Sequence, residues 1–198
     1  MSEMRDLEAR INAAEALIFD CDGTLLKTPD LYALGWQSAF GAAGLKIDAD
    51  WYHARAGMSE HVLMDEFEAE RGVTLDRGQT VRDLRKAVLR QMHTVAEIPA
   101  IASIARKYHD RKPVAVASGG PKAIVIPALE AAGLLPLFKS VVTMDDVANA
   151  KPSPDLFLLA AENLAIPAKA CLVFEDSPQG LLAAERAGMS AIDVNGLM

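Results

Sequence analysis

Four short apolar runs that each end in polar or glycine-containing residues constrain the fold of this chain more than any other feature. They occupy residues 16–19, 113–117, 140–142 and 171–174. Short apolar runs that stop at a turn are typical of strands buried on both faces. Helical patterns occur at roughly 121–133, 153–165 and 177–187. A weaker strand pattern follows at 191–194. This alternation predicts an α/β fold with a Rossmann-like parallel sheet and helices on both of its faces.

Residues 29–93 interrupt the alternation. Apolar residues recur there at helical spacing, and no strand pattern is present. The interruption falls directly after the loop that ends the first strand. We therefore predict a discontinuous core domain of residues 1–28 and 94–198 with an inserted α-helical cap domain of residues 29–93. An amphipathic helix at residues 2–14 is expected in front of the first strand.

Composition and charge narrow the classes of function. The 198-residue chain has a formal net charge of −7, which disfavours broad electrostatic attraction to nucleic acid or to an anionic membrane. No uninterrupted apolar run of about 18 residues is present, and the N-terminal segment is charged, so neither a membrane span nor a signal peptide is predicted. The two cysteines and four histidines lack zinc-site spacing. We expect a cytoplasmic protein that is a monomer or a weak dimer.

Asp20 and Asp22 stand two residues apart where the first strand ends. Alternate residues of a strand point to the same side, so both carboxylates can meet one ligand at the sheet edge where α/β proteins bind ligands. Carboxylates this close repel each other unless a cation or a shared proton lies between them. The alternative is a plain turn at Asp22-Gly23 with Asp20 as a cap. The pair taken by itself leaves both interpretations open.

Three further strand ends carry residues of the polarity that a phosphate and a divalent cation require. Ser118-Gly119-Gly120 offers a hydroxyl and backbone N–H groups at the start of a helix. Lys151 precedes a helix that begins with prolines and can reach a phosphate as a point charge. Glu175 and Asp176 suit oxygen ligation of Mg²⁺. Each has an ordinary structural explanation, as a turn, a solvated lysine or acids at a helix start. Their combination predicts a site for phosphate and Mg²⁺.

The motifs that carry these residues are DCDGTL, VASGG, KPSPD and FEDSPQG, with the helical insertion after the first. In this order they resemble the four motifs of the haloacid dehalogenase-like hydrolase superfamily. The similarity extends from about Ala16 to Asn195 and is greatest to the branch of β-phosphoglucomutase and fructose-1-phosphate phosphatase. The resemblance implies a Mg²⁺-dependent phosphatase that hydrolyses a small phosphorylated metabolite, such as a sugar phosphate, through an aspartyl-phosphate intermediate.

The resemblance also implies a role for each charged motif residue. Asp20 corresponds to the nucleophile and Asp22 to the general acid and base. Lys151 corresponds to the lysine that offsets charge on the nucleophile and the phosphoryl group. Mg²⁺ would be bound by Asp20, Asp176 and the backbone carbonyl of Asp22, with Glu175 as a looser or water-mediated ligand.

The resemblance places the substrate against further residues of the core and the cap. Residues implied to bind its phosphate group, together with Lys151, are Thr24, Ser118, Gly119 and Gly120. Residues that align with the family's substrate loop in the cap, and are therefore candidates for specificity, are Arg55, Gly57, Met58 and Ser59.

Two departures from the family pattern separate a phosphatase from a phosphomutase. Tyr32 stands where the mutases carry a histidine, and Glu60 stands where they carry an arginine for a second phosphate. Both favour a phosphatase. Tyr32 cannot act as the imidazole of the mutases, and the acid Glu60 repels a second phosphate. Arg55 or the stretch with Arg82 and Lys86 remains an alternative source of the missing cation, so a β-phosphoglucomutase-like mutase stays open.

A non-catalytic regulatory module with the same fold is the third alternative. Such a module would be expected to have lost one of the three charged residues implied in catalysis, Asp20, Asp22 or Lys151. All three are present, which favours an enzyme.

Overall fold

The computed structural model of the protein describes residues 2–56 and 58–197. In this part of the chain, five strands form one parallel sheet in the order β3-β2-β1-β4-β5. They are β1 (Ala16–Phe19), β2 (Val114–Ala117), β3 (Ser140–Val142), β4 (Cys171–Glu175) and β5 (Ser190–Asp193). β1 is central, and its Ile18 pairs with Ala115 on one side and with Val173 on the other. The predicted α/β class is confirmed.

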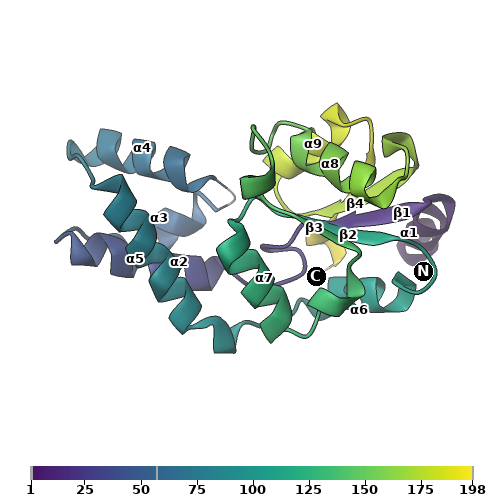
Figure 1. The fold of residues 1–198 in the computed structure, drawn as a ribbon, viewed down its shortest axis with the longest axis horizontal. Helices are drawn as coiled ribbons and strands as arrows, with labels where there is room; N and C mark the ends of the chain where they lie inside the picture. Colours follow the sequence, from purple (N-terminus) through teal and green to yellow (C-terminus); the bar gives the residue numbers. More distant parts are fainter. Residues whose placement is uncertain (1, 57, 198) are drawn as a thin grey trace.

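The alternating side chains of β1 face two different layers of helices. Leu17 and Phe19 belong to a hydrophobic cluster with the helices on one face. Ile18 belongs to a second cluster on the other face. Helices α1 (Ser2–Ala13), α6 (Pro99–Tyr108) and α7 (Lys122–Ala131) contribute to the first cluster on this face of the sheet. Helices α8 (Asp155–Leu164) and α9 (Pro178–Arg186) supply the second, and Figure 1 shows α7 and α8 on opposite sides of the sheet.

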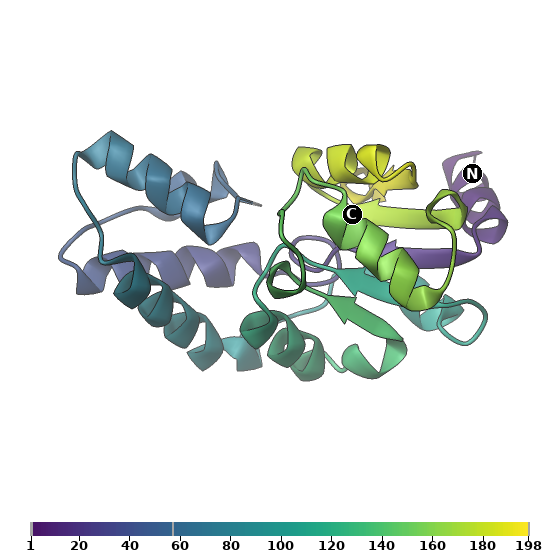
Figure 2. The same cartoon turned by 45° about the horizontal axis from the view of Figure 1, so that its top comes forward.

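Among the described residues, four helices form a separate lobe, which we call the cap: α2 (Pro29–Ala42), α3 (Ala49–His53), α4 (Glu60–Arg71) and α5 (Arg77–Arg90). The rings of Phe40 and Phe67 stack in its centre with 4.1 Å between centroids. Gly35 lets α2 and α5 approach closely, because a Cβ there would lie 2.6 Å from Val88 Cγ2. Figure 2 shows the strands ending toward this lobe.

Short 3₁₀ helices complete the chain as η1 (Met92–Thr94), η2 (Leu135–Leu137), η3 (Met144–Asp146), η4 (Ala168–Ala170) and η5 (Val194–Leu197). The last strand begins one residue earlier than its pattern predicts, at Ser190, and Val194 falls in η5 instead of the strand. None of the helices in the described part of the chain has the length and apolar character of a membrane span.

Candidate active site

The carboxyl-terminal edge of the sheet brings the predicted charged residues together. Asp20 follows β1, Ser118 follows β2, and Glu175 is the last residue of β4. Because neighbouring parallel strands end at the same edge, residues far apart in sequence meet there. All three are buried, with exposed fractions of 4%, 0% and 1% in that order. Lys151 reaches the same point from the loop that precedes α8.

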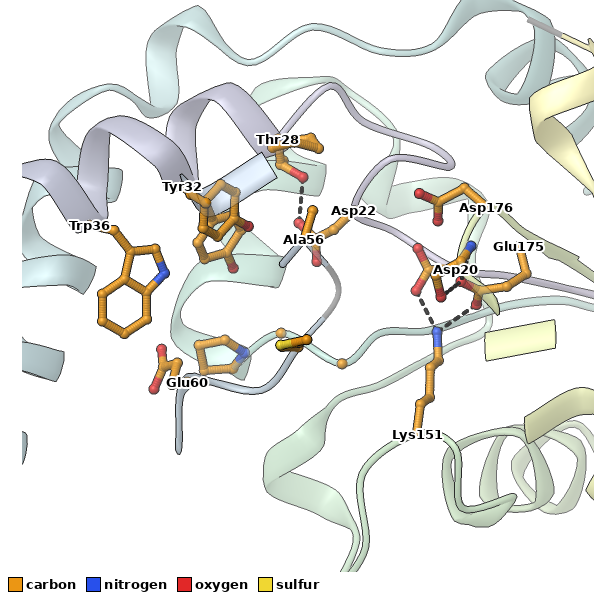
Figure 3. A pocket seen from close by; sticks show the side chains of 17 residues that line it. Asp20, Asp22, Thr28, Tyr32, Trp36, Ala56, Glu60, Lys151, Glu175 and Asp176 are labelled. Carbon is orange, nitrogen blue, oxygen red and sulfur yellow. Dashed lines mark hydrogen bonds and ion pairs between the residues drawn. The ribbon is translucent and has the colours of Figure 1, made fainter. Parts of the chain in front are cut away.

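Lys151 forms two ion pairs inside the protein (Figure 3). Its Nζ lies 2.6 Å from Asp20 Oδ1 and 2.7 Å from Glu175 Oε2. Burial alone would lower the pKa of Lys151, but Asp20 and Glu175 raise it further than burial lowers it. The lysine is therefore a fixed positive charge, and it holds the predicted nucleophile in place through charge-assisted hydrogen bonds.

Negative charge exceeds positive charge around this lysine. Burial, and next the charge of Glu175, raise the pKa of Asp20 well above its usual range, with Lys151 acting in the opposite direction. Burial and Glu175 also raise the pKa of Asp176, to about 6. Raised carboxyl pKa values indicate that the ionised acids lack sufficient compensating charge in the protein alone.

The same acids form a group that fits a metal ion. Asp20, Glu175 and Asp176 each offer an oxygen, and these atoms lie within 4.8 Å of one another in the described residues. Three carboxylate oxygens are hard ligands of the kind that Mg²⁺ and Ca²⁺ take, in contrast to the nitrogen and sulfur ligands of zinc. A divalent cation here would also offset the excess negative charge.

The side chain of Asp22 is hydrogen-bonded at both oxygens instead of joining that group. Thr28 Oγ1 donates to Asp22 Oδ1 at 2.6 Å, and Ser118 Oγ donates to Asp22 Oδ2 at 3.1 Å. Burial raises the pKa of Asp22, while these two hydrogen bonds act to lower it. A buried carboxyl with a raised pKa can carry a proton near neutral pH, as a general acid requires.

Comparison with known proteins identifies the family of this fold and site. A family model described as haloacid dehalogenase-like hydrolase matches residues 14–188. The chain belongs to this family. A fructose-1-phosphate phosphatase of Escherichia coli, YqaB, is 34% identical to this haloacid dehalogenase-like hydrolase over 178 residues, which cover 90% of the chain and 95% of the relative.

Two solved structures show the same likeness in three dimensions. CbbY from Rhodobacter sphaeroides, solved in complex with phosphate, is 25% identical with a TM-score of 0.80, and the match covers 90% of this chain and 84% of CbbY. A putative β-phosphoglucomutase from Thermotoga maritima is 26% identical with a TM-score of 0.69 over 88% and 82% of the two chains. The predicted family and the predicted enzyme class, a haloacid dehalogenase-like phosphoric monoester hydrolase, are confirmed.

Two threonines of this haloacid dehalogenase-like hydrolase hold acids of the site. Thr24, implied by the resemblance to bind phosphate, donates its hydroxyl to Asp176 Oδ1 at 3.1 Å. Thr28, which was not predicted from the sequence as a site residue, donates to Asp22. Its sequence signal is slight, because it is only the residue before the proline that begins α2. Ser118 is likewise engaged with Asp22 and accepts a hydrogen bond from Gly120 N at 2.9 Å.

Two glycines leave room for the acids and were also missed as site residues. A Cβ on Gly23, which has a φ of +86°, would lie 2.3 Å from Asp176 Oδ2. A Cβ on Gly180 would lie 2.0 Å from Glu175 Cδ. Real side chains do not approach this closely, so both positions require glycine while the acids stay where they are. Gly180 belongs to the FEDSPQG motif, which is where a signal was available.

The cap residues that align with the family's substrate loop do not all line the pocket among the described residues. Arg55 forms ion pairs with Glu66 and Glu70 of α4, and it is not among the described residues that line the pocket. Ser59 caps the first turn of α4 by accepting a hydrogen bond from Val62 N. Gly57 lies outside the described residues, whereas Met58 lines the pocket.

The pocket lies between the cap and the acids at the sheet edge. Its core side includes Asp20, Asp22, Gly119, Gly120, Lys151 and Asp176. Its cap side includes Tyr32, Trp36, Tyr52, Ala56, Met58 and Glu60. Figure 3 shows Tyr32, Trp36 and Glu60 on one side of this space, with Asp20, Lys151 and Asp176 on the other. A substrate in the pocket would contact the charged core with one end and an aromatic, weakly polar surface with the other.

Proposed function

We propose that this chain is a Mg²⁺-dependent phosphatase that hydrolyses a small sugar phosphate through an aspartyl phosphate on Asp20. The observation that supports this most is the contact of Lys151 with Asp20, because it places a fixed positive charge beside the carboxylate that would receive the phosphoryl group. Residues that would hold Mg²⁺ are Asp20, Asp176 and Glu175, with Asp22 contributing a backbone carbonyl as in the family. The bound ion supplies charge neutralisation and alignment of the phosphoryl oxygens.

In the first step, an oxygen of Asp20 attacks phosphorus and the bond from phosphorus to the sugar oxygen breaks. Asp22 gives its proton to that leaving oxygen, so the sugar departs as a neutral alcohol. Lys151 offsets the negative charge of the nucleophile and of the phosphoryl group as they approach. Backbone N–H groups near Gly119 and Gly120 orient the phosphate at the start of the following helix.

In the second step, Asp22 is ionised and takes a proton from a water molecule that attacks the phosphorus of the aspartyl phosphate. The bond from phosphorus to Asp20 breaks, which restores the carboxylate and releases inorganic phosphate. Asp22 must therefore carry a proton in one step and lose it in the next. Its two hydrogen bonds fix its position, and its raised pKa suits it to both states.

A phosphomutase is the second candidate, favoured by the structural likeness to a putative β-phosphoglucomutase. A mutase needs a cation in the cap to bind the second phosphate of a bisphosphate. In the described part of the pocket the cap side carries no lysine or arginine. Arg82 and Lys86 line a separate depression on α5, and Arg55 is engaged within the cap. These positions support the phosphatase.

An arginine of α5 lies beside Glu60 and compensates its charge. From sequence, Glu60 is an acid that repels a second phosphate; in the structure, Arg85 lies beside it, with Nη2 2.9 Å from Glu60 Oε2. The guanidinium counteracts that repulsion. The preference for a monophosphate therefore rests on the absence of a lining cation among the described residues, more than on the negative charge of Glu60.

Phosphate release from a panel of compounds tests the proposal. The panel contains fructose 1-phosphate, phosphoglycolate, phenyl phosphate and β-glucose 1-phosphate, each with Mg²⁺ and with a chelator. We expect Mg²⁺-dependent release from the sugar phosphates by the wild type and none by Asp20→Asn. Glucose 6-phosphate formed from β-glucose 1-phosphate faster than phosphate is released, and only with a sugar bisphosphate present, would establish the mutase instead.

A further inference from the structure

The hydroxyl of Tyr32 is the one buried side-chain polar atom that lacks a hydrogen-bond partner in the described residues. Tyr32 lies on α2, lines the pocket and has an exposed fraction of 8%. Burying a hydroxyl without a partner is unfavourable, and buried hydroxyls are normally paired. An unpaired hydroxyl at the wall of a binding pocket therefore indicates that a ligand supplies its partner.

The ring of Tyr32 is held in place by its neighbours. It lies almost parallel to the ring of Tyr52, with 6.4 Å between centroids and 19° between planes. Burial, and next the charge of Asp22, raise the pKa of Tyr32, so the phenol stays neutral and can both donate and accept. Because Asp22 faces the leaving oxygen in the proposed mechanism, Tyr32 lies on the side of the departing alcohol.

Glu60 supplies a second fixed polar group on the same wall. Its side chain is 9% exposed, and Arg85 donates to both of its oxygens, from Nε at 3.2 Å and from Nη2 at 2.9 Å. Each carboxylate oxygen keeps a further lone pair for another donor. The bidentate contact fixes the orientation of Glu60 and offsets its charge, which makes it an acceptor for a neutral hydroxyl group.

We infer that Tyr32 and Glu60 recognise hydroxyl groups on the part of the substrate that leaves, and that the substrate is a monophosphate whose remainder is neutral and polyhydroxylated. Tyr32 would exchange a hydrogen bond with one hydroxyl while Glu60 accepts from another. The aromatic walls of Trp36 and Tyr52 suit the C–H faces of such a molecule. This assignment of specificity rests on the proposed phosphatase function.

The test compares two probes that differ in hydroxyl content, fructose 1-phosphate and phenyl phosphate, with the intact protein and Mg²⁺. Tyr32→Phe removes only the phenolic oxygen. We expect it to lower kcat/KM for fructose 1-phosphate by about 10-fold or more and to change kcat/KM for phenyl phosphate less than about twofold, because only the first probe loses a hydrogen bond. Tyr108→Phe, at a buried tyrosine of α6 outside the pocket lining, is the matched control and should change neither.

The thermal midpoint of the ligand-free variant gives a second readout. Tyr32→Phe should melt at or above the wild-type temperature, since no hydrogen bond within the described protein is lost. Glu60→Gln provides an independent variant, and it should also lower kcat/KM for fructose 1-phosphate more than for phenyl phosphate. Equal losses with both probes, no loss in either variant, or a lower melting temperature of Tyr32→Phe would each overturn the inference while the phosphatase function stands. Failure of the wild type to release phosphate from any probe would overturn both.

Discussion

At the scale of single residues, the described site contains four carboxylic acids and one positively charged lysine. Asp20, Asp22, Glu175 and Asp176 lie around Lys151, and burial raises the pKa of three of these acids. Glu175 accepts more hydrogen bonds than the other three acids in the described residues. Its Oε1 accepts from the backbone N and the hydroxyl of Ser177, and its Oε2 accepts from Lys151. In the described residues, the side-chain hydrogen bond to Asp176 comes from Thr24, so Asp176 keeps more of its oxygen lone pairs free for a metal than Glu175 does. Glu175 therefore positions Lys151 as well as offering an oxygen to a metal.

The pKa of Asp176 predicts how the metal-free protein responds to pH. Its folded pKa is about 6, above the value of about 3.9 for an unperturbed aspartate. The folded state therefore holds this proton more tightly than the unfolded state, so the contribution of Asp176 to stability is fully present below about pH 4 and is lost as the pH rises through 6. We expect the free energy of unfolding of the wild type, minus that of Asp176→Asn, to fall over this range in chelator.

Denaturation by urea at several pH values measures this difference. Added Mg²⁺ should stabilise the wild type most above pH 6, where Asp176 is ionised, and should stabilise Asp176→Asn much less. A difference that rises with pH in chelator would show that the pKa of Asp176 is lowered in the folded protein, in conflict with this description.

The hydrogen bond from Thr28 predicts a shift in the pH dependence of the rate. Thr28→Val keeps the shape of the side chain and removes the donor to Asp22, which raises the pKa of Asp22 further. The first step needs protonated Asp22, so the rate falls as this group ionises on the alkaline side. We expect the alkaline limb of kcat/KM to move to higher pH in Thr28→Val. Thr74→Val, at an exposed threonine of the cap, should leave the profile in place; a Thr28→Val profile identical to wild type would remove Thr28 from this role.

The sequence predicted the motif residues of the site but not the contacts between side chains within the cap. The four motifs predicted Asp20, Asp22, Lys151 and Asp176 because each stands at the end of a recognisable strand or in a fixed motif. Arg85 gave no such signal, since its contact with Glu60 joins α4 and α5 across a cap whose packing cannot be read from helical periodicity. The ion pairs of Arg55 with Glu66 and Glu70 are likewise contacts within the cap that the family alignment does not show.

At the scale of elements, the end of β4 and the start of α9 form one unit around Glu175. Ser177 caps α9 by accepting a hydrogen bond from Gly180 N at 3.1 Å and donates its own hydroxyl to Glu175 at 2.7 Å. Gly180 completes this unit, because any side chain there would occupy the place of the Glu175 carboxyl. The position of Lys151 therefore depends on how the end of β4 packs against the start of α9, because Glu175 contacts both Lys151 and Ser177.

Gly180→Ala should disturb this unit at a distance from the substrate. We expect a loss of about 1–3 kcal/mol in the free energy of unfolding, as for other overpacked sites, together with a lower kcat because Glu175 no longer holds Lys151. Gly41→Ala is the matched control: Gly41 lies in α2 with open space where its Cβ would be, and alanine there should be neutral or slightly stabilising. Equal stability of Gly180→Ala and wild type, measured by chemical denaturation, would contradict the close contact.

Strand bounds were predicted from the sequence more accurately than strand order or helix ends. The buried runs of β1, β2 and β4 were predicted to within a residue or so, because strands covered on both faces are apolar throughout. The order of the strands was not predicted, since it depends on which crossovers pack together. Helix ends were displaced by a few residues: α7 covers Lys122–Ala131 where the pattern indicated 121–133. Capping and turn geometry decide such ends.

At the scale of the whole molecule, the core and the cap contribute different ends of one pocket. The core supplies Asp20, Asp22 and Lys151, and the cap supplies aromatic side chains with the hydroxyl of Tyr32. We therefore propose that chemistry and specificity are carried by separate parts of the chain, the core and the segment inserted after β1. Variants of the core should change the rate with all substrates, whereas variants of the cap should change the ratio between substrates.

Asp22→Asn is the core variant that tests this division. It should slow the release of phosphate from fructose 1-phosphate and from phenyl phosphate alike, by about 10²–10⁴-fold, because a general acid and base acts on every substrate. Steady-state rates with both compounds measure it. A large loss with one compound and none with the other would place Asp22 in substrate selection instead of catalysis.

Covalent labelling of Asp20 tests the central claim most directly. Wild-type protein, Mg²⁺ and fructose 1-phosphate labelled with radioactive phosphorus are mixed and quenched in acid within one turnover, and the protein is digested. We expect a phosphorylated peptide that contains Asp20, with the label stable in acid and lost in base as for an acyl phosphate, and no label in Asp20→Asn. Release of labelled phosphate by the wild type without labelled protein, together with turnover by Asp20→Asn, would contradict the account.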